Sequence, residues 1–273
     1  MRISFWKMHG AGNDFILVDD RHLTFPAADA AWLAALSARR TGVGCEGVIL
    51  IQPSDKADFR MRFFNPDGGE VEMCGNGARC VARLASELGA APPKMAIDTV
   101  AGILRAEAGG DSVRLWMTPP RDWRLNRALE ADGHRLAYSF VNSGVPHAVV
   151  EVDDIEDTDV QRAGAAIRYH PDFAPAGTNA NFVSVTGPQA LSVRTYERGV
   201  EAETLACGTG VVASALIGGR VGWVRPPVRV TCASGDVLDV DYRLVADGAE
   251  EVTLTGPAVH VFQGSVEYPP RQS

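Results

Sequence analysis

A Cys-Gly-x-Gly motif occurs twice in this chain and constrains its fold more than any other feature. The motif begins at Cys74 and again at Cys207, 133 residues later, and an apolar stretch with helical spacing follows each copy. A glutamate, Glu70 or Glu203, lies four residues before each cysteine. Segments that recur in the same context indicate that the chain consists of two related halves.

Other residues recur at matching distances from the two cysteines. Glu46 and Asn179 each lie 28 residues before their cysteine, and Asp14 and His147 each lie 60 residues before it. The repeated spacing supports a duplication, because a chance match would not extend over the whole series.

We expect the two halves to meet around Pro119-Pro120. The predicted first domain is 1–119 plus about 262–273 and carries Cys74, and the second is 120–261 and carries Cys207. Each domain is predicted to contain one central helix directly after its cysteine. The first of these helices ends near Gly89, and the second ends at the glycine pair Gly218-Gly219.

Most of the remaining pattern predicts strands, with one further peripheral helix at Asp159–Tyr169. Short apolar or alternating runs predict the strands at Phe15–Asp19, Gly47–Gln52, Phe59–Phe63, Met95–Val100, Ser112–Met117, Ala148–Val152, Asn181–Val185, Leu191–Tyr196, Val228–Cys232 and Val237–Tyr242.

Charge and cysteine content exclude several classes of protein. The net charge of -8, without a run of Lys or Arg, argues against nucleic acid as a partner. No apolar run approaches the roughly 20 residues of a membrane helix, and the first residues lack a signal-peptide pattern, so we expect no membrane partner and a cytoplasmic protein. Five cysteines without C-x-x-C spacing predict free thiols, with neither a disulfide framework nor a metal site.

A cysteine at the start of a helix has a specific chemistry. The first backbone N–H groups there are unpaired and the helix dipole is positive, so both favour negative charge. We therefore expect the pKa of Cys74 and Cys207 to be lowered toward neutrality. The other three cysteines, Cys45, Cys80 and Cys232, are interpreted as small buried hydrophobes.

Two such thiols in matching halves predict a symmetric acid/base pair. If both sulfurs face one cleft, one can remove a proton from a substrate carbon while the other delivers a proton to the opposite face, as epimerisation requires. The two helix starts would stabilise charge that develops on the substrate carboxylate. The few lysines and the lack of a pyridoxal-lysine context favour a route without a cofactor.

Longer motifs around these residues resemble the diaminopimelate epimerase family. The segments from Asn65 to Arg79 and from Tyr196 to Gly210 resemble the family's two cysteine signatures, and Lys7 to Phe15 resembles its N-terminal motif. Gly144-Val-Pro-His147 and Gly177-Thr-Asn179 add two shorter matches. The resemblance spans nearly the whole chain and implies an α+β fold of two pseudo-symmetric domains, each a mixed barrel-like sheet around a central helix.

The resemblance also implies an activity without a cofactor. The small-molecule substrate would be LL- or meso-2,6-diaminoheptanedioate, on the route to lysine and peptidoglycan precursors. Cys74 would be the proton donor and Cys207 the acceptor in the LL-to-meso direction. His147 and Glu197 would assist near the reacting carbon.

Substrate contacts carry over in the same way. The distal end of the substrate would be held by three asparagines and by Arg198, which can pair bidentately with its carboxylate. The reacting carboxylate would receive donors from the two helix starts. The asparagines are Asn13, Asn65 and Asn179, and the helix starts are Gly75-Asn76 and Gly208-Thr209.

The chain departs from the family pattern at several positions. Gly69 stands where serine is usual, Gly44-Cys45-Glu46-Gly47 replaces a common Gly-x-Asp-Gln or Gly-x-Asp-Gly, and Val145 stands where some members have asparagine. The roles of Gly47 and Val145 therefore stay open.

Other functions also remain open at this point. Proline racemase and hydroxyproline epimerase share Cys-Gly-x-Gly but typically have His where this chain has Asn76, and Ser-Pro where it has Leu205-Ala206. A histidine epimerase, a redox sensor that cross-links its two cysteines, and a non-catalytic binding module are further alternatives. The sequence is compatible with a homodimer and leaves the oligomeric state undetermined.

Overall fold

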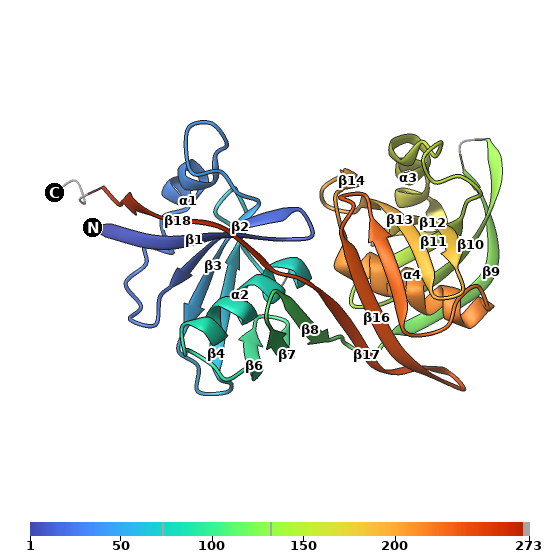
Figure 1. Ribbon diagram of the computed structural model, residues 1–273. Helices are drawn as coiled ribbons and strands as arrows, with labels where there is room; N and C mark the ends of the chain where they lie inside the picture. The colour runs from blue at the N-terminus through green and yellow to red at the C-terminus, as the bar shows by residue number, and fades with distance from the viewer. Residues whose placement is uncertain (73, 132, 270–273) are drawn as a thin grey trace. The chain divides into compact units, whose positions relative to one another are not determined.

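The computed structural model describes residues 1–72, 74–131 and 133–269, which divide into two compact units (Figure 1). The first unit is Met1–Leu115 with the segment from Pro257 onward, and the second unit is Trp116–Gly256. Residues 270–273, which the sequence analysis assigned to the first domain, lie outside the described residues.

The first unit is built on one mixed sheet. Strand β1 pairs antiparallel with β18 and β2, β2 runs parallel to β3, and β3 is antiparallel to β4. Strand β4 is antiparallel to the short β5 and parallel to β6, which is antiparallel to β7. The strands are β1 (Arg2–Gly10), β2 (Asn13–Asp19), β3 (Gly47–Gln52), β4 (Phe59–Phe64), β5 (Glu70–Val71), β6 (Lys94–Thr99), β7 (Gly102–Gly109), β8 (Ser112–Trp116) and β18 (Val259–Glu267).

The second unit repeats this pairing pattern strand for strand. Strand β10 is antiparallel to β9 and β11, β11 is parallel to β12, and β12 is antiparallel to β13. Strand β13 is antiparallel to the short β14 and parallel to β15, which is antiparallel to β16. The strands are β9 (Arg121–Ala131), β10 (His134–Asn142), β11 (Pro146–Glu151), β12 (Asn179–Gly187), β13 (Ala190–Glu197), β14 (Ala202–Thr204), β15 (Val228–Cys232), β16 (Val237–Val245) and β17 (Gly248–Pro257).

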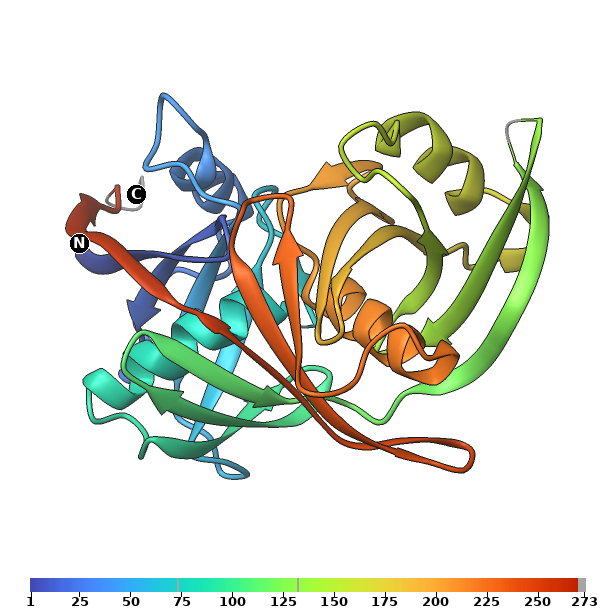
Figure 2. The same cartoon turned by 45° about the vertical axis from the view of Figure 1, so that its right-hand side comes forward.

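Each sheet surrounds one central helix, as expected for the predicted α+β fold (Figures 1 and 2). Helix α2 (Gly75–Glu87) contacts β1, β2, β3 and β7 of the first unit. Helix α4 (Gly208–Val221) contacts β10 to β13, β15 and β16 of the second. The duplicated sequence motif therefore marks the start of the same structural element in both units.

A second helix covers the outer face of each sheet. Helix α1 (Ala30–Ser37) packs Leu33 and Leu36 against Val48 and Leu50 of β3, whereas Ile49 of the same strand faces α2. Strand β3 is therefore buried at every position. Helix α3 (Val160–Arg168) covers β12 and β13 in the same way, and a 3-10 turn, η1 (Pro171–Phe173), follows it.

The predicted end of the second central helix is wrong. Helix α4 continues through Gly218 and Gly219 to Val221 and ends at Gly222, which adopts the left-handed conformation. The internal glycines serve packing, since a Cβ at Gly219 would lie 2.1 Å from the hydroxyl of Tyr242. Helix α1 and six longer strands were not predicted from the sequence, and β12 is longer at both ends than predicted; the six strands are β1, β7, β9, β10, β17 and β18. Within the described ranges no helix is long and apolar enough to cross a bilayer.

Candidate active site

The first half of the candidate site is the start of α2. Cys74 is the N-cap of this helix, half-buried and in extended conformation. Gly75 opens the helix, and apart from its chain neighbours and the nearby helix backbone no atom lies within 4 Å of the place where its Cβ would be. The N–H groups of the first helical turn, which lack intrahelical partners, are therefore set beside the thiol on an open side of the backbone.

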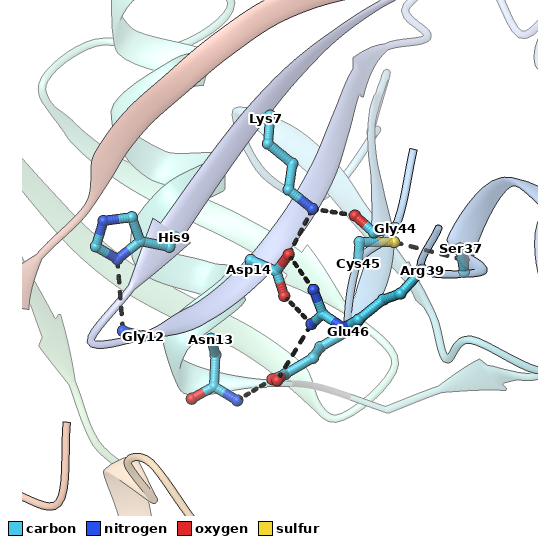
Figure 3. Close-up of polar contacts among 10 residues, drawn as sticks. All are labelled: Lys7, His9, Gly12, Asn13, Asp14, Ser37, Arg39, Gly44, Cys45 and Glu46. Atoms are coloured by element: carbon cyan, nitrogen blue, oxygen red, sulfur yellow. Dashed lines mark hydrogen bonds and ion pairs between the residues drawn. The ribbon is translucent and has the colours of Figure 1, made fainter. Parts of the chain in front are cut away.

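A hydrogen-bonded chain of side chains runs from α2 to β3 beside Cys74. Arg79 Nη2 donates to Asn76 Oδ1 at 2.9 Å, and Asn76 Nδ2 donates to Asn13 Oδ1 at 2.9 Å. Figure 3 shows the last link, in which Asn13 Nδ2 donates to the carboxylate of Glu46. Because a guanidinium can only donate, both amides have one allowed orientation. The predicted substrate residues Asn13 and Asn76 are thus brought together.

A cluster of charges, in which Lys7 is buried and Arg39 is exposed, lies next to this chain (Figure 3). Lys7 Nζ is 2.6 Å from Asp14 Oδ2, and Arg39 Nη2 is 2.6 Å from Asp14 Oδ1. Although burial opposes its ionisation, hydrogen bonds from Arg39 and Lys7 lower the pKa of Asp14. Burial raises the pKa of Glu46, against the hydrogen bond from Asn13. Asp14 and Glu46 are neighbours across the parallel β2–β3 pair. The backbone N–H of Glu46 donates a hydrogen bond to the Asp14 carbonyl.

The second half of the candidate site is the start of α4. Cys207 is the N-cap of this helix, also in extended conformation, and is 8% exposed. Its Sγ lies 3.5 Å from Thr209 Oγ1, which is 2.9 Å from His147 Nε2. His147 Nδ1 in turn lies 3.1 Å from Asn181 Nδ2. The structure therefore connects the predicted residues Cys207, Thr209 and His147 in one chain.

The imidazole of His147 is uncharged. The side chain is fully buried in β11, and this desolvation lowers the pKa of His147 to about 3, against the hydrogen bond from Asn181. The positive charge of Arg198 acts in the same direction. A neutral imidazole with so low a pKa cannot take up a proton near neutral pH, so His147 can serve only as a hydrogen-bonding group.

Two further predicted residues of the second unit, Asn179 and Arg198, lie where β12 and β13 meet. Asn179 Nδ2 donates to the Pro146 carbonyl at 2.8 Å, and its Oδ1 accepts from the Arg198 backbone N–H at 2.8 Å. Arg198 Nη1 donates to the Ala176 carbonyl at 3.0 Å. Asn179 pairs with His147 across the parallel strands, the same relationship that Glu46 and Asp14 have in the first unit.

Two predicted residues have other surroundings. Glu197, at the end of β13, accepts a hydrogen bond from Thr204 Oγ1 at 2.9 Å. Asn65 lies in the turn between β4 and β5, where its backbone N–H donates to the Gly69 carbonyl at 2.9 Å.

The departures from the family pattern have local structural consequences. A Cβ at Gly47 would lie 2.2 Å from the ring of Phe63, so this position has no room for a side chain. Val145 lies in the turn between β10 and β11, where its carbonyl accepts from the Ser143 N–H at 3.2 Å. Neither residue offers a polar side chain to a ligand.

All five cysteines are free thiols. Cys45, Cys80 and Cys232 are buried, and burial raises the pKa of Cys80 to about 12. No group of three or more His, Cys, Asp or Glu side chains suited to a metal ion occurs among the residues that the structure describes.

Sequence reasoning missed three side chains of the site. Asn181 lies two residues after Asn179 on the same strand, so a period of two could have placed both on one face. Glu46 was noted for its spacing and as part of a departure from the family pattern, and its contact with Asn13 depends on the β2–β3 register. Arg79 is part of the first cysteine motif, but its complete burial has no signal in the sequence.

Comparison with protein families gives one clear match. The model of the family described as Diaminopimelate epimerase matches residues 5–122 and 139–261. The chain is 42% identical to the diaminopimelate epimerase of Aquifex aeolicus (strain VF5), over 96% of this chain and 97% of that protein. It is 44% identical to the protein of the same name from Chlorobaculum tepidum, over 95% of this chain and 99% of that one.

Solved structures with the same fold are more distant in sequence. A Bacillus anthracis phenazine biosynthesis protein of the PhzF family superposes with a TM-score of 0.75 at 17% identity, covering 98% of this chain and 100% of that chain. A probable proline racemase from Agrobacterium radiobacter K84 superposes with a TM-score of 0.72 at 20% identity, covering 99% and 94%. Similarity at this level of identity shows the fold alone.

Proposed function

The chain belongs to the diaminopimelate epimerase family, and from this premise we propose that it interconverts LL- and meso-2,6-diaminoheptanedioate with Cys74 and Cys207 as its acid/base pair. It is an isomerase whose reaction lies on the route to lysine and peptidoglycan precursors. One observation supports the assignment of the thiols above all: each cysteine is the N-cap of the central helix of its unit. A reaction that depends on two reduced thiols suits the cytoplasm, where thiols stay reduced.

The proposed chemistry is a pair of proton transfers at the substrate α-carbon. In the LL-to-meso direction the Cys207 thiolate takes the α-proton, and the electron pair of the broken C–H bond is shared with the adjacent carboxylate. The Cys74 thiol then gives its proton to the opposite face of the carbon. Cys74 is left as the thiolate and Cys207 as the thiol, so the meso-to-LL reaction uses the same groups with exchanged roles.

Charge that develops on the substrate carboxylate needs donors that are already in place. The N–H groups of Gly75 and Asn76 at the start of α2, and of Gly208 and Thr209 at the start of α4, are proposed as these donors. The positive ends of the two helices add a favourable field in the first turn. The open space around the Cβ position of Gly75 supports this role, because a ligand can approach the backbone there.

The distal amino-acid end of the substrate would be held by Asn13, Asn65, Asn179 and Arg198. One guanidinium N–H of Arg198 donates to the Ala176 carbonyl. A guanidinium carries five N–H donors in a planar fork. Glu197 is proposed to assist near the reacting carbon, and His147 to assist through its contact with Thr209.

Solvent isotope exchange tests the proposal directly. With reduced protein in heavy water, deuterium should enter the α-position of diaminopimelate while LL and meso forms interconvert. Cys74→Ser and Cys207→Ser should each abolish interconversion, whereas Cys232→Ser, at a buried cysteine outside both helix starts, should leave it intact. Full activity of either active-site variant, or equal activity on proline, hydroxyproline or histidine, would overturn it.

A further inference from the structure

The orientation of the Asn181 side chain is determined by its surroundings. Its Nδ2 lies 2.9 Å from the Ala148 carbonyl oxygen and 3.1 Å from His147 Nδ1. Because a carbonyl oxygen can only accept, the amide must direct its nitrogen to this side. The Asn181 Oδ1, on the other side, accepts from Thr195 Oγ1 at 3.0 Å. Both hydrogens of the amide are thus committed, one to Ala148 and one to His147.

This arrangement selects one tautomer of His147. An Nδ1 that accepts a hydrogen bond carries no hydrogen, and a neutral imidazole has one ring hydrogen, which must then lie on Nε2. Burial keeps the ring neutral, because it lowers the pKa of His147 to about 3. The Nε2–H therefore points at Thr209 Oγ1, 2.9 Å away.

The direction of the chain continues through Thr209. A hydroxyl that accepts from His147 retains its own hydrogen for donation, and Cys207 Sγ lies 3.5 Å from Thr209 Oγ1, within the range of a hydrogen bond to sulfur. A donor at this distance stabilises a thiolate more than a thiol, since hydrogen bonds to charged acceptors are the stronger ones.

We propose that Asn181 is a positioning residue that holds His147 as its Nε2–H tautomer, so that Thr209 donates its hydroxyl hydrogen to Cys207 and favours the Cys207 thiolate. The inference deepens the proposed function and rests on its assignment of Cys207 as a reacting thiol. Asn76 occupies the place of Thr209 in the first unit, and its hydrogen-bonded chain leads to Asn13 and Glu46 instead. The chain from Asn181 through His147 and Thr209 therefore belongs to the Cys207 half.

The tautomer of His147 can be read by NMR. In protein labelled with ¹⁵N-histidine, the His147 signal, assigned by its absence from His147→Gln, should show a protonated Nε2 and an unprotonated Nδ1 from pH 8 down to pH 5.5. An Nδ1–H tautomer or an imidazolium in this range would overturn the proposal. In Asn181→Leu, which lacks the amide, the single tautomer should be lost.

The ionisation of Cys207 can be followed by the pH dependence of its alkylation with iodoacetamide, read by mass spectrometry on the Cys207 peptide. Asn181→Leu and Thr209→Val should each raise the pH midpoint of labelling by about one unit, the effect of losing one hydrogen bond to a charged sulfur. Thr209→Ser, which keeps the hydroxyl, should retain the wild-type midpoint. In turnover, Asn181→Leu should lower kcat and leave KM nearly unchanged.

Thr195→Val is the matched control. It removes a buried hydroxyl that contacts the opposite end of the same amide, so it should lower Tm without moving the midpoint. If the pH midpoint of Cys207 labelling is unchanged in both Asn181→Leu and Thr209→Val, the proposal is overturned even if Tm falls. If Asn181→Leu does not fold, the midpoint of Thr209→Val decides. Cys207→Ser distinguishes failure of the proposed function from failure of the positioning role of Asn181. If Cys207→Ser stays active, the proposed function fails. If it is inactive while the labelling midpoints of the other variants do not move, only the positioning role fails.

Discussion

Arg194 holds Glu203 through two parallel hydrogen bonds, from Nε to Oε1 at 2.7 Å and from Nη2 to Oε2 at 2.8 Å. Glu203 lies in β14, four residues before Cys207. In the first unit Arg62 binds Glu70 in the same way, from Nε to Oε1 at 2.8 Å and from Nη2 to Oε2 at 2.6 Å. Glu70 lies four residues before Cys74. A bidentate pair therefore fixes the segment that leads into each cysteine.

Breaking the pair in the second unit should reduce activity more than stability. Glu203→Gln removes the charge and one acceptor oxygen, which lets β14 shift and misplaces Cys207. A displacement below 1 Å at a reacting group is expected to lower kcat/KM about tenfold. Steady-state kinetics at saturating and limiting diaminopimelate measure the loss. Glu250→Gln, at an exposed carboxylate paired with Arg243 between β16 and β17, is the control and should keep wild-type kinetics.

Removing the charge of Asp14 should destabilise the first unit in a pH-dependent manner. Asp14 accepts from Lys7, which is buried, and from Arg39, so Asp14→Asn leaves a buried ammonium without its carboxylate. The expected loss is roughly 1–3 kcal/mol of unfolding free energy at pH 7. The pKa of Asp14 is lower in the folded protein than in the unfolded chain. Its stabilising contribution is therefore fully present above the ordinary aspartate pKa and is lost as the pH falls through the folded-state pKa.

Urea unfolding at pH 7 and pH 3 tests this, because urea does not screen charges. The difference between wild type and Asp14→Asn should be largest at pH 7 and should narrow at pH 3. Asp19→Asn provides the comparison, since Asp19 pairs with Arg21 at the surface and should contribute at most about 1 kcal/mol. If the difference in unfolding free energy between wild type and Asp14→Asn does not change with pH, the assigned ion pairs are contradicted.

The sequence contains more information about the site than about the sheet around it. Both central helices could be placed because the cysteine motif and the apolar spacing after it are local signals. Asp14 with Glu46, and His147 with Asn179, were noted for their equal spacing from the two cysteines, and each pair proves to be adjacent across a parallel strand pair. A duplicated chain conserves such register, so spacing carried three-dimensional information here.

Other elements have no comparable local signal. Helix α1 is apolar on nearly every side, so it lacks the period that distinguishes a helix from a strand. Strand β9 is largely exposed, and its polar residues give no clean alternation. Gly219 lies inside α4 because Tyr242, which is distant in sequence, approaches it closely, so the glycine pair does not mark the helix end. The tautomer of His147 likewise depends on Asn181, a contact between two strands.

The buried neutral state of His147 should make the protein sensitive to acid. The unfolded chain takes up a proton on this residue as the pH falls below about 6.5, whereas the folded protein does so only near the pKa of about 3. The folded-state pKa is lowered, so stability falls with pH between these values. Over pH 7 to pH 5 the loss from this residue should be about 2 kcal/mol.

A variant without the imidazole isolates this contribution. The unfolding free energies of wild type and His147→Gln are measured in urea at both pH values. The wild-type value minus the variant value should be about 2 kcal/mol smaller at pH 5 than at pH 7. All other titrating groups are common to the two proteins and cancel. A difference that stays constant would show that His147 is not held neutral.

The two glycines of the first cysteine motif should respond in opposite ways to alanine. A Cβ at Gly77 would lie 2.7 Å from Ile49 Cδ1, so Gly77→Ala should displace α2 from β3 and cost about 1–3 kcal/mol of stability. Gly75 has open space around its Cβ position and occupies the first helical turn, so Gly75→Ala should leave stability unchanged or raise it by up to about 1 kcal/mol. Its new methyl group would instead occupy the space assigned to the substrate carboxylate and raise KM. Thermal unfolding and kinetics on the pair of variants separate packing from binding, and a loss of stability in Gly75→Ala with normal KM would refute the assignment of this helix start to the substrate.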